Sequence, residues 1–178
     1  NGLGVVMEGT GARVEDSVIH QNYGSGIKIH NAGVTITRCR IFNNISPTNG
    51  GGIYAKSGKP VHIDANQILN NYAQESGGGV YVDGEQARDS VKLSGNRIEG
   101  NQSQIDGGGV WASWSSVVNN LIFSNVATEK GGGVFSTSAT IDRNHIATNQ
   151  SAQGGGVFGE TGSCFVGSKI EKNSITGS

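Results

Sequence analysis

The residues best suited to catalysis in this sequence are three carboxylates that lie just before successive Gly-Gly-Gly segments. They are Glu75, Asp106 and Glu129, and Lys130 follows directly after the last of them. Carboxylates near a basic group are the arrangement by which many enzymes cleave glycosidic bonds. Loop segments of this kind also carry solvated charges with no catalytic role, so the pattern allows catalysis without requiring it.

Aromatic residues form a second group with regular spacing. Each Gly-Gly-Gly segment is followed by Ile or Val and then by a ring, in the order Tyr54, Tyr81, Trp111, Phe135 and Phe158. Rings in such a column can bind sugars or a protein partner, or they can stabilise neighbouring strands by stacking on one another. The sequence leaves both interpretations open.

Histidine and cysteine do not add a metal site. His20, His30, His62 and His145 fall at different positions of the repeat described below. Cys39 and Cys164 lie five repeats apart, roughly 24 Å when strands stack at their usual spacing, which is too far for a disulfide. We therefore expect two free thiols and no cofactor, and an acidic patch of this kind would bind Ca²⁺ only weakly.

The composition restricts the classes of protein that could present these residues. The 178 residues include 30 Gly but only 2 Pro, and the net charge is −1. Glycine without a three-residue period excludes collagen, and the missing basic field argues against nucleic-acid binding. No apolar run is long enough for membrane insertion. An all-β protein with many turns remains.

A repeat determines how the β-structure is organised. The pattern Ile-x-x-Asn occurs seven times, and its isoleucines are 22, 27, 30, 24, 24 and 24 residues apart. Apolar residues recur five positions before each isoleucine and directly after the glycines, as inward columns of stacked strands require. A period of this length without helical segments predicts a β-solenoid with one coil per repeat. We expect one domain over 1–178, with about seven coils of 22–30 residues.

Asparagines recur at two fixed positions of the repeat. The first set is Asn22, Asn44, Asn71, Asn101, Asn125, Asn149 and Asn173, and the second is Asn66, Asn96, Asn120 and Asn144. Identical amides stacked one coil apart can hydrogen-bond as ladders, so we interpret them as structural. Three of them begin glycosylation-like sequences, Asn44-Ile-Ser46, Asn101-Gln-Ser103 and Asn149-Gln-Ser151. Because ladder members point inward, we expect no glycan there.

The repeat also carries a family resemblance. The sequence Ile-x-x-Asn-x-Ala-x-x-x-Gly-Gly-x-Val, present at Ile68–Val80 and Ile122–Val134, resembles the paired FxxN and GGAI motifs of polymorphic outer-membrane protein repeats. Those repeats belong to the right-handed parallel β-helix (pectate-lyase-like) superfamily. The resemblance implies a right-handed parallel β-helix that is secreted or at the cell surface. The superfamily contains adhesins and structural proteins as well as polysaccharide lyases and hydrolases, so the fold alone does not decide the function.

The two ends of the sequence fall partway through a coil. Joining the end of one copy to the start of another would place Ile170 and the next Ile19 27 residues apart, within the observed range. The chain is then either a segment of a longer β-helix or a subunit that stacks end to end. Heterologous, head-to-tail interfaces of this kind do not form a closed ring, so stacked subunits would build filaments. We see no capping helix at either end.

These observations favour one function over another. We expect a structural or adhesive module that associates with itself end to end or with polysaccharide, rather than an enzyme. The alternative is a polysaccharide lyase or hydrolase that uses the acidic residues and the aromatic column as a sugar groove. No residues here resemble the acidic calcium site and catalytic arginine of pectate lyases.

Overall fold

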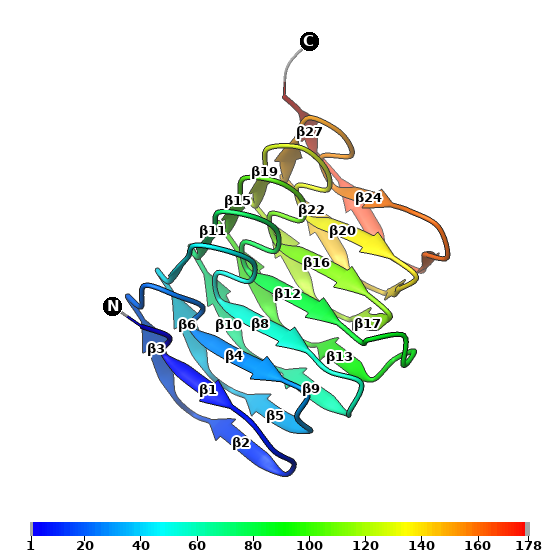
Figure 1. Ribbon diagram of the computed structural model, residues 1–178. Helices are drawn as coiled ribbons and strands as arrows, with labels where there is room; N and C mark the ends of the chain where they lie inside the picture. Colours follow the sequence, from blue (N-terminus) through cyan, green and yellow to red (C-terminus); the bar gives the residue numbers. More distant parts are fainter. Residues whose placement is uncertain (1, 177–178) are drawn as a thin grey trace.

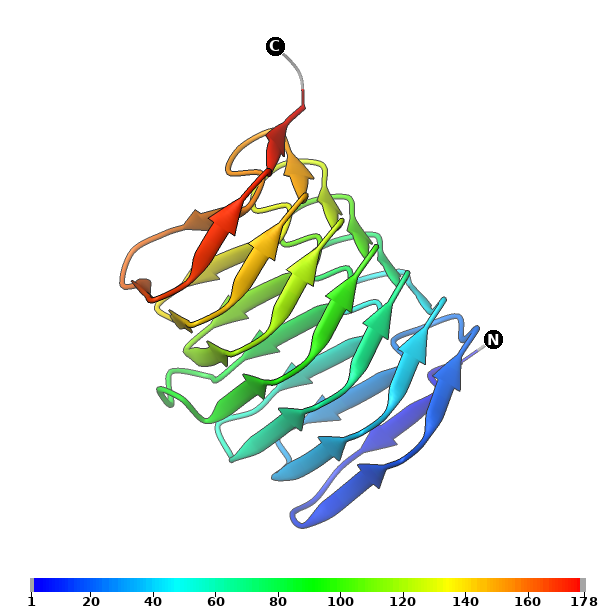
Figure 2. The ribbon, with the colours of Figure 1, turned by 180° about the vertical axis from the view of Figure 1, so that it is seen from behind.

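The computed structural model describes residues 2–176, which form strands, corners and loops without any helix. The strands build four parallel sheets, three of seven strands and one of six. Each coil contributes one strand to each sheet in turn, except that the first coil has no strand in the six-stranded sheet, and successive coils stack from the N-terminus to the C-terminus (Figure 1). Seen from behind, the strands of consecutive coils again run parallel along the whole stack (Figure 2).

Sheets A and B come first in each coil. Sheet A consists of β1 (Val5–Met7), β4 (Ile27–His30), β8 (Ile53–Lys56), β12 (Val80–Asp83), β16 (Val110–Ser113), β20 (Val134–Thr137) and β24 (Val157–Gly159). Sheet B consists of β2 (Ala12–Glu15), β5 (Val34–Thr37), β9 (Val61–Asp64), β13 (Val91–Ser94), β17 (Ser115–Val118), β21 (Thr140–Asp142) and β25 (Cys164–Val166).

Sheets C and D complete the coil. Sheet C consists of β3 (Val18–His20), β6 (Arg40–Phe42), β10 (Gln67–Leu69), β14 (Arg97–Glu99), β18 (Leu121–Phe123), β22 (His145–Ala147) and β26 (Lys169–Glu171). Sheet D consists of the short strands β7 (Ile45–Ser46), β11 (Tyr72–Ala73), β15 (Gln102–Ser103), β19 (Val126–Ala127), β23 (Gln150–Ser151) and β27 (Ser174–Ile175). The repeat did not lead us to expect this fourth sheet.

The core is a stack of apolar columns that run along the solenoid. The isoleucines of the repeat pair in register through sheet C, and Ile41, Ile68 and Ile98 have no exposed surface. The column before them, in sheet B, and the column after the glycines, in sheet A, also pair in register and are buried in the middle coils. In the last coil the same columns are uncovered, so Phe165 and Ile170 are 43% and 49% exposed, contrary to the inward burial we expected.

Two corners of each coil after the first contain only two residues, and the second residue is usually a ladder asparagine. The first residue takes a positive φ, for example 54° at Ala65 and 52° at Asn70. The ladder asparagines themselves do not take this conformation in residues 2–176. The first glycine of each triplet does take a positive φ, 70° at Gly77, which most other residues would resist.

The seven asparagines of the first set hydrogen-bond in series. Asn71 is typical, since its Nδ2 donates to Asn101 Oδ1 at 3.0 Å and to the backbone oxygen of Ile41 at 3.0 Å. The backbone N–H of Asn71 donates to the same Asn101 Oδ1 at 2.9 Å. The second set is joined in the same way from Asn66 to Asn144. The ladders therefore satisfy the polar groups of the sharp corners inside the core, where unpaired groups would be costly.

Candidate functional site

The aromatic column, Tyr54, Tyr81, Trp111, Phe135 and Phe158, lies on the outer side of sheet A with one ring per coil. Neighbouring rings are nearly parallel, at angles of 4° to 11°, and their centroids are 4.2 to 5.9 Å apart. Each inner ring therefore turns its faces toward the rings of the adjacent coils. This is the geometry of offset stacking between strands.

Stacking leaves mainly ring edges for contact with a ligand. Phe135 is only 5% exposed, and Lys28 and Lys130 lie over the rings of Tyr54 and Phe158 at 5.6 and 4.9 Å. Burial, with a smaller effect from Asp83, raises the pKa of Tyr81 and of Tyr54 above the ordinary range. Both phenols are therefore neutral at physiological pH.

The three candidate carboxylates occupy two neighbouring columns. Glu75 and Glu129 share one column with Ile105 between them, because the Ile105 N–H donates to the Glu75 carbonyl and the Glu129 N–H to the Ile105 carbonyl. Asp106 lies one position later and pairs across the coils with Lys130. Asp106 therefore does not lie in the column of Glu75 and Glu129 but in the neighbouring column, one residue later in the coil.

Each of these groups has contacts of its own. Glu75 accepts a hydrogen bond from Asn49 Nδ2 at 2.7 Å, and Asp106 Oδ1 accepts one from the Lys130 backbone N–H at 3.1 Å. The Lys130 ammonium lies 3.5 Å from Glu160. Burial raises the pKa of Asp106, an effect that Lys130 opposes and Glu129 reinforces. A raised pKa is the direction expected of a general acid.

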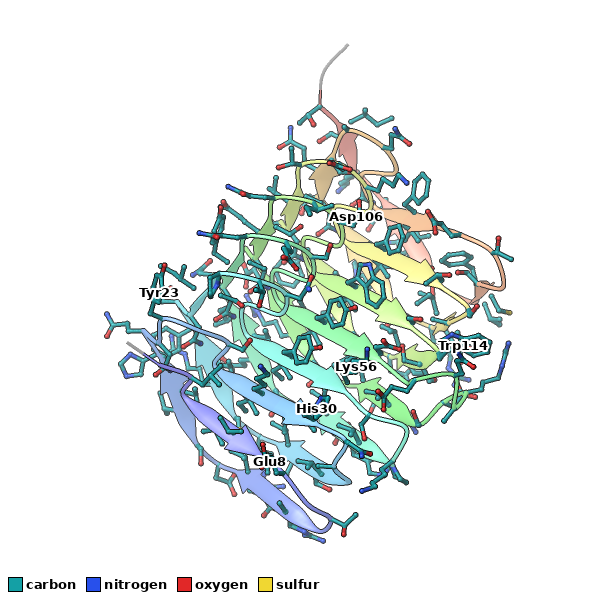
Figure 3. All side chains as sticks on the ribbon, in the orientation of Figure 1. Glu8, Tyr23, His30, Lys56, Asp106 and Trp114 are labelled. Atoms are coloured by element: carbon teal, nitrogen blue, oxygen red, sulfur yellow. The ribbon has the colours of Figure 1, made fainter. Side chains whose placement is uncertain are left out.

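One hollow brings an acidic candidate and an aromatic candidate together. It has a volume of about 450 Å³ and lies at the N-terminal end of the aromatic column, where Tyr54, Lys28, Asn49 and Glu75 line it with Tyr23. Figure 3 shows Tyr23 at this edge of the stack and Asp106 farther along it. Glu129 and Asp106 do not line this hollow.

The histidines and cysteines lie on separate parts of the fold. His145 Nε2 is 2.9 Å from Glu171, and His20 stacks on Phe42 with centroids 4.8 Å apart. Within residues 2–176, no group of three or more His, Cys, Asp or Glu side chains is arranged to hold a metal. Cys39 is buried, Cys164 is exposed, and both thiols are free.

Sequence reasoning missed a second cleft, at the corner between sheets A and B. Its volume is about 320 Å³, and it is lined by Lys56, Asp83, Glu85, Gln86, Ser113 and Trp114. The loop at residues 84–90 forms one wall. That loop makes the repeat between Ile68 and Ile98 the longest in the chain, at 30 residues, and this length was the signal available in the sequence.

Parallel sheets wound coil upon coil, with buried amide ladders and an outer aromatic column, define the class of parallel β-solenoids. A comparison with known families matches residues 1–139 to the family described as the right handed beta helix region. The chain belongs to this right-handed β-helix family, as the sequence predicted. Searches of curated proteins and of solved structures gave no match. Residues 2–176 contain no helix with the length and apolar character to cross a membrane.

Proposed function

We propose that this chain is a structural and adhesive module that is secreted or held at the cell surface, and that it does not act as an enzyme. The observation that carries the proposal is the continuity of the stack. Hydrogen-bonded amides run from Asn22 to Asn173 without interruption, beside sheets in register over the same coils. Such a stack holds its outer columns at a fixed repeat, which suits multivalent contact with an extended surface.

An adhesion assay tests this role. Beads that carry the folded domain are passed over intact cells and over polysaccharide-coated surfaces, and the fraction retained under flow is measured. We expect retention above that of beads carrying an unrelated domain of equal net charge, and loss of retention after denaturation. Equal retention of both kinds of bead on every surface would contradict the adhesive role.

The rival function, a polysaccharide lyase or hydrolase, is favoured by the hollow that contains Glu75, Lys28 and Tyr54 and by the raised pKa of Asp106. A screen for depolymerisation separates the two functions. Release of sugar products that is abolished by Glu75→Gln or Glu129→Gln, but not by Glu99→Gln on sheet C, would establish the enzyme. Glu99 is a suitable control because its carboxylate is already paired with Arg97 at 2.7 Å.

End-to-end association is the form of assembly we propose for the module. The support is the apolar surface of the last coil, where Phe165, Ile170 and Ile175 are 43%, 49% and 68% exposed. A second copy could continue the strands and cover these side chains, although the joint itself would include Asn1, Gly177 and Ser178, which lie outside the described residues. Light scattering should show mass that increases with concentration and that decreases in Ile170→Asp. A constant monomer mass at all concentrations would contradict this form of assembly.

A further inference from the structure

Loop lengths differ sharply among the corners of the coil. The corner between sheets B and C contains two residues in all seven coils, and the corner between sheets C and D contains two residues in the six coils that have a sheet D strand. The corner between sheets A and B varies instead, because residues 84–90 separate β12 from β13 whereas Trp114 alone separates β16 from β17. Binding residues tend to lie in variable loops supported by a rigid scaffold. These two unequal corners lie in adjacent coils and together form the second cleft.

The floor of the cleft is set by strand register. Lys56, Asp83 and Ser113 occupy one column at the ends of β8, β12 and β16, so their spacing is fixed by the sheet. Figure 3 shows Lys56 on the sheet and Trp114 at the rim beside it. Further coils flank β8, β12 and β16 on both sides in sheet A, so the cleft does not depend on either end of the chain.

The loop wall is held by specific hydrogen bonds. The Glu85 N–H donates to Asp83 Oδ1 at 2.9 Å, and Glu85 Oε2 accepts from the Gly58 N–H at 3.1 Å. The Asp89 N–H donates to the Trp114 carbonyl at 3.1 Å. A Cβ at Gly84 would collide with that same carbonyl, so the loop passes directly over the Trp114 corner. These hydrogen bonds fix the loop that forms the wall, so the cleft is preorganised for a ligand.

The polar groups in the cleft retain hydrogen-bonding capacity. The Lys56 ammonium and Asp83 Oδ2 are 3.9 Å apart, which is too long for a hydrogen bond. Glu85 uses Oε2 for Gly58 and has a second oxygen available. Gln86 adds an amide that both donates and accepts, and its side chain is exposed. The cleft thus holds both hydrogen-bond donors and acceptors together with the half-buried indole of Trp114.

Trp114 differs from the rings of the aromatic column. Those rings stack on one another, whereas Trp114 has no ring–ring or cation–π contact with any residue of the described part of the chain. The φ of Trp114 is 49°, which is unusual for a bulky residue, and this conformation turns the chain at the one-residue corner between β16 and β17. An indole in one cleft with hydrogen-bond donors and acceptors matches a sugar ring, which presents apolar C–H faces and hydroxyl edges.

We propose that this cleft, and not the aromatic column, binds a sugar unit of a neutral, hydroxyl-rich glycan. Trp114 packs against the C–H face of the sugar, the carboxylates of Asp83 and Glu85 accept from its hydroxyls, and Lys56 and Gln86 donate to them. The inference rests on the proposed adhesive role, for which it names the contact site and the class of ligand.

Calorimetric titration with neutral cello-, xylo-, manno- and galacto-oligosaccharides tests the proposal. The key variant is Trp114→Asn, because asparagine tolerates the positive φ of this corner, as Asn31 and Asn119 do at 46° and 56°. We expect binding of at least one neutral series and about a tenfold or greater loss of affinity in Trp114→Asn, as for other aromatic anchors. Glu85→Gln should weaken the same ligand.

Trp111→Tyr is the matched control, because it keeps a stacked ring in the aromatic column. It should change affinity by less than about twofold, and ligand should still alter its fluorescence through Trp114, since only these two tryptophans are present. Full affinity in Trp114→Asn, loss in Trp111→Tyr, or binding only of oligogalacturonate or choline would overturn the proposal. Adhesion by a domain that binds no neutral sugar would overturn this inference alone, whereas sugar binding without adhesion would overturn only the proposed function.

Discussion

Removing one amide from the middle of the ladder should destabilise the protein strongly. In Asn101→Ala, Asn71 loses the acceptor for its backbone N–H and for one side-chain N–H. The Ile68 carbonyl loses its side-chain donor but keeps its place in the ladder between β10 and β14. All three groups are inside the stack, since Asn71 is 1% exposed and Ile68 is fully buried. The two N–H groups of Asn71 are left unpaired, and at about 1–3 kcal/mol for each the expected loss in unfolding free energy is about 2–6 kcal/mol.

Asn22→Ala at the start of the ladder is the matched control. Asn44 Oδ1 would still accept from the Asn22 backbone N–H at 3.1 Å, so no buried group is left unpaired and the loss should be about 1 kcal/mol or less. Urea unfolding followed by circular dichroism measures both variants. Equal losses at the two positions, or a loss below about 1 kcal/mol at Asn101, would refute the view that buried amide pairing holds the coils together.

Four further results are expected. Gly79→Ala places a Cβ 2.6 Å from the Gly109 oxygen and should cost about 2 kcal/mol or more in urea unfolding, whereas Gly58→Ala, with its nearest neighbour at 3.9 Å, should stay within about 0.5 kcal/mol. Burial raises the pKa of Asp106 in the folded protein, so ionisation of this carboxyl destabilises the fold as the pH rises through that pKa. Asp106→Asn should therefore raise the urea midpoint at pH 7 and leave it nearly unchanged at pH 3. A larger effect at pH 3 than at pH 7 would contradict the burial effect. Cys164 should react with a thiol reagent in the native protein, while Cys39, 2% exposed and with a pKa raised by burial, should react only after denaturation. Folded protein from a eukaryotic secretory host should show no mass shift on deglycosylation, because Asn44, Asn101 and Asn149 have no exposed surface.

The sequence was sufficient to predict the stack because each coil repeats the same local requirements. Ile68, Asn71 and Val80 recur at fixed separations, and only a parallel solenoid places all copies of each in one column. The ladder followed from the same register. The fourth sheet was missed because its strands, such as β11, contain two residues and give no periodicity of their own.

The candidate site was harder to predict because it depends on the angles between ring planes and on the path of the loop at residues 84–90. Column position alone put Tyr81 and Trp111 on one face, but it could not distinguish stacked rings from rings with free faces. The cleft around Trp114 needs the path of residues 84–90 over the neighbouring corner, and that path depends on bonds such as Asp89 N–H to the Trp114 carbonyl. A long loop in the sequence signals such a feature without specifying its chemistry.

We propose that the outer surface of this β-helix binds polysaccharide and does not cleave it. The most direct measurement incubates the domain with neutral polysaccharides and determines, in the same samples, the fraction of polymer bound and the chain length of the polymer. We expect bound polymer of unchanged length, with binding reduced in Trp114→Asn. Shortened polymer that is restored to full length by Glu75→Gln or Glu129→Gln would contradict the proposal.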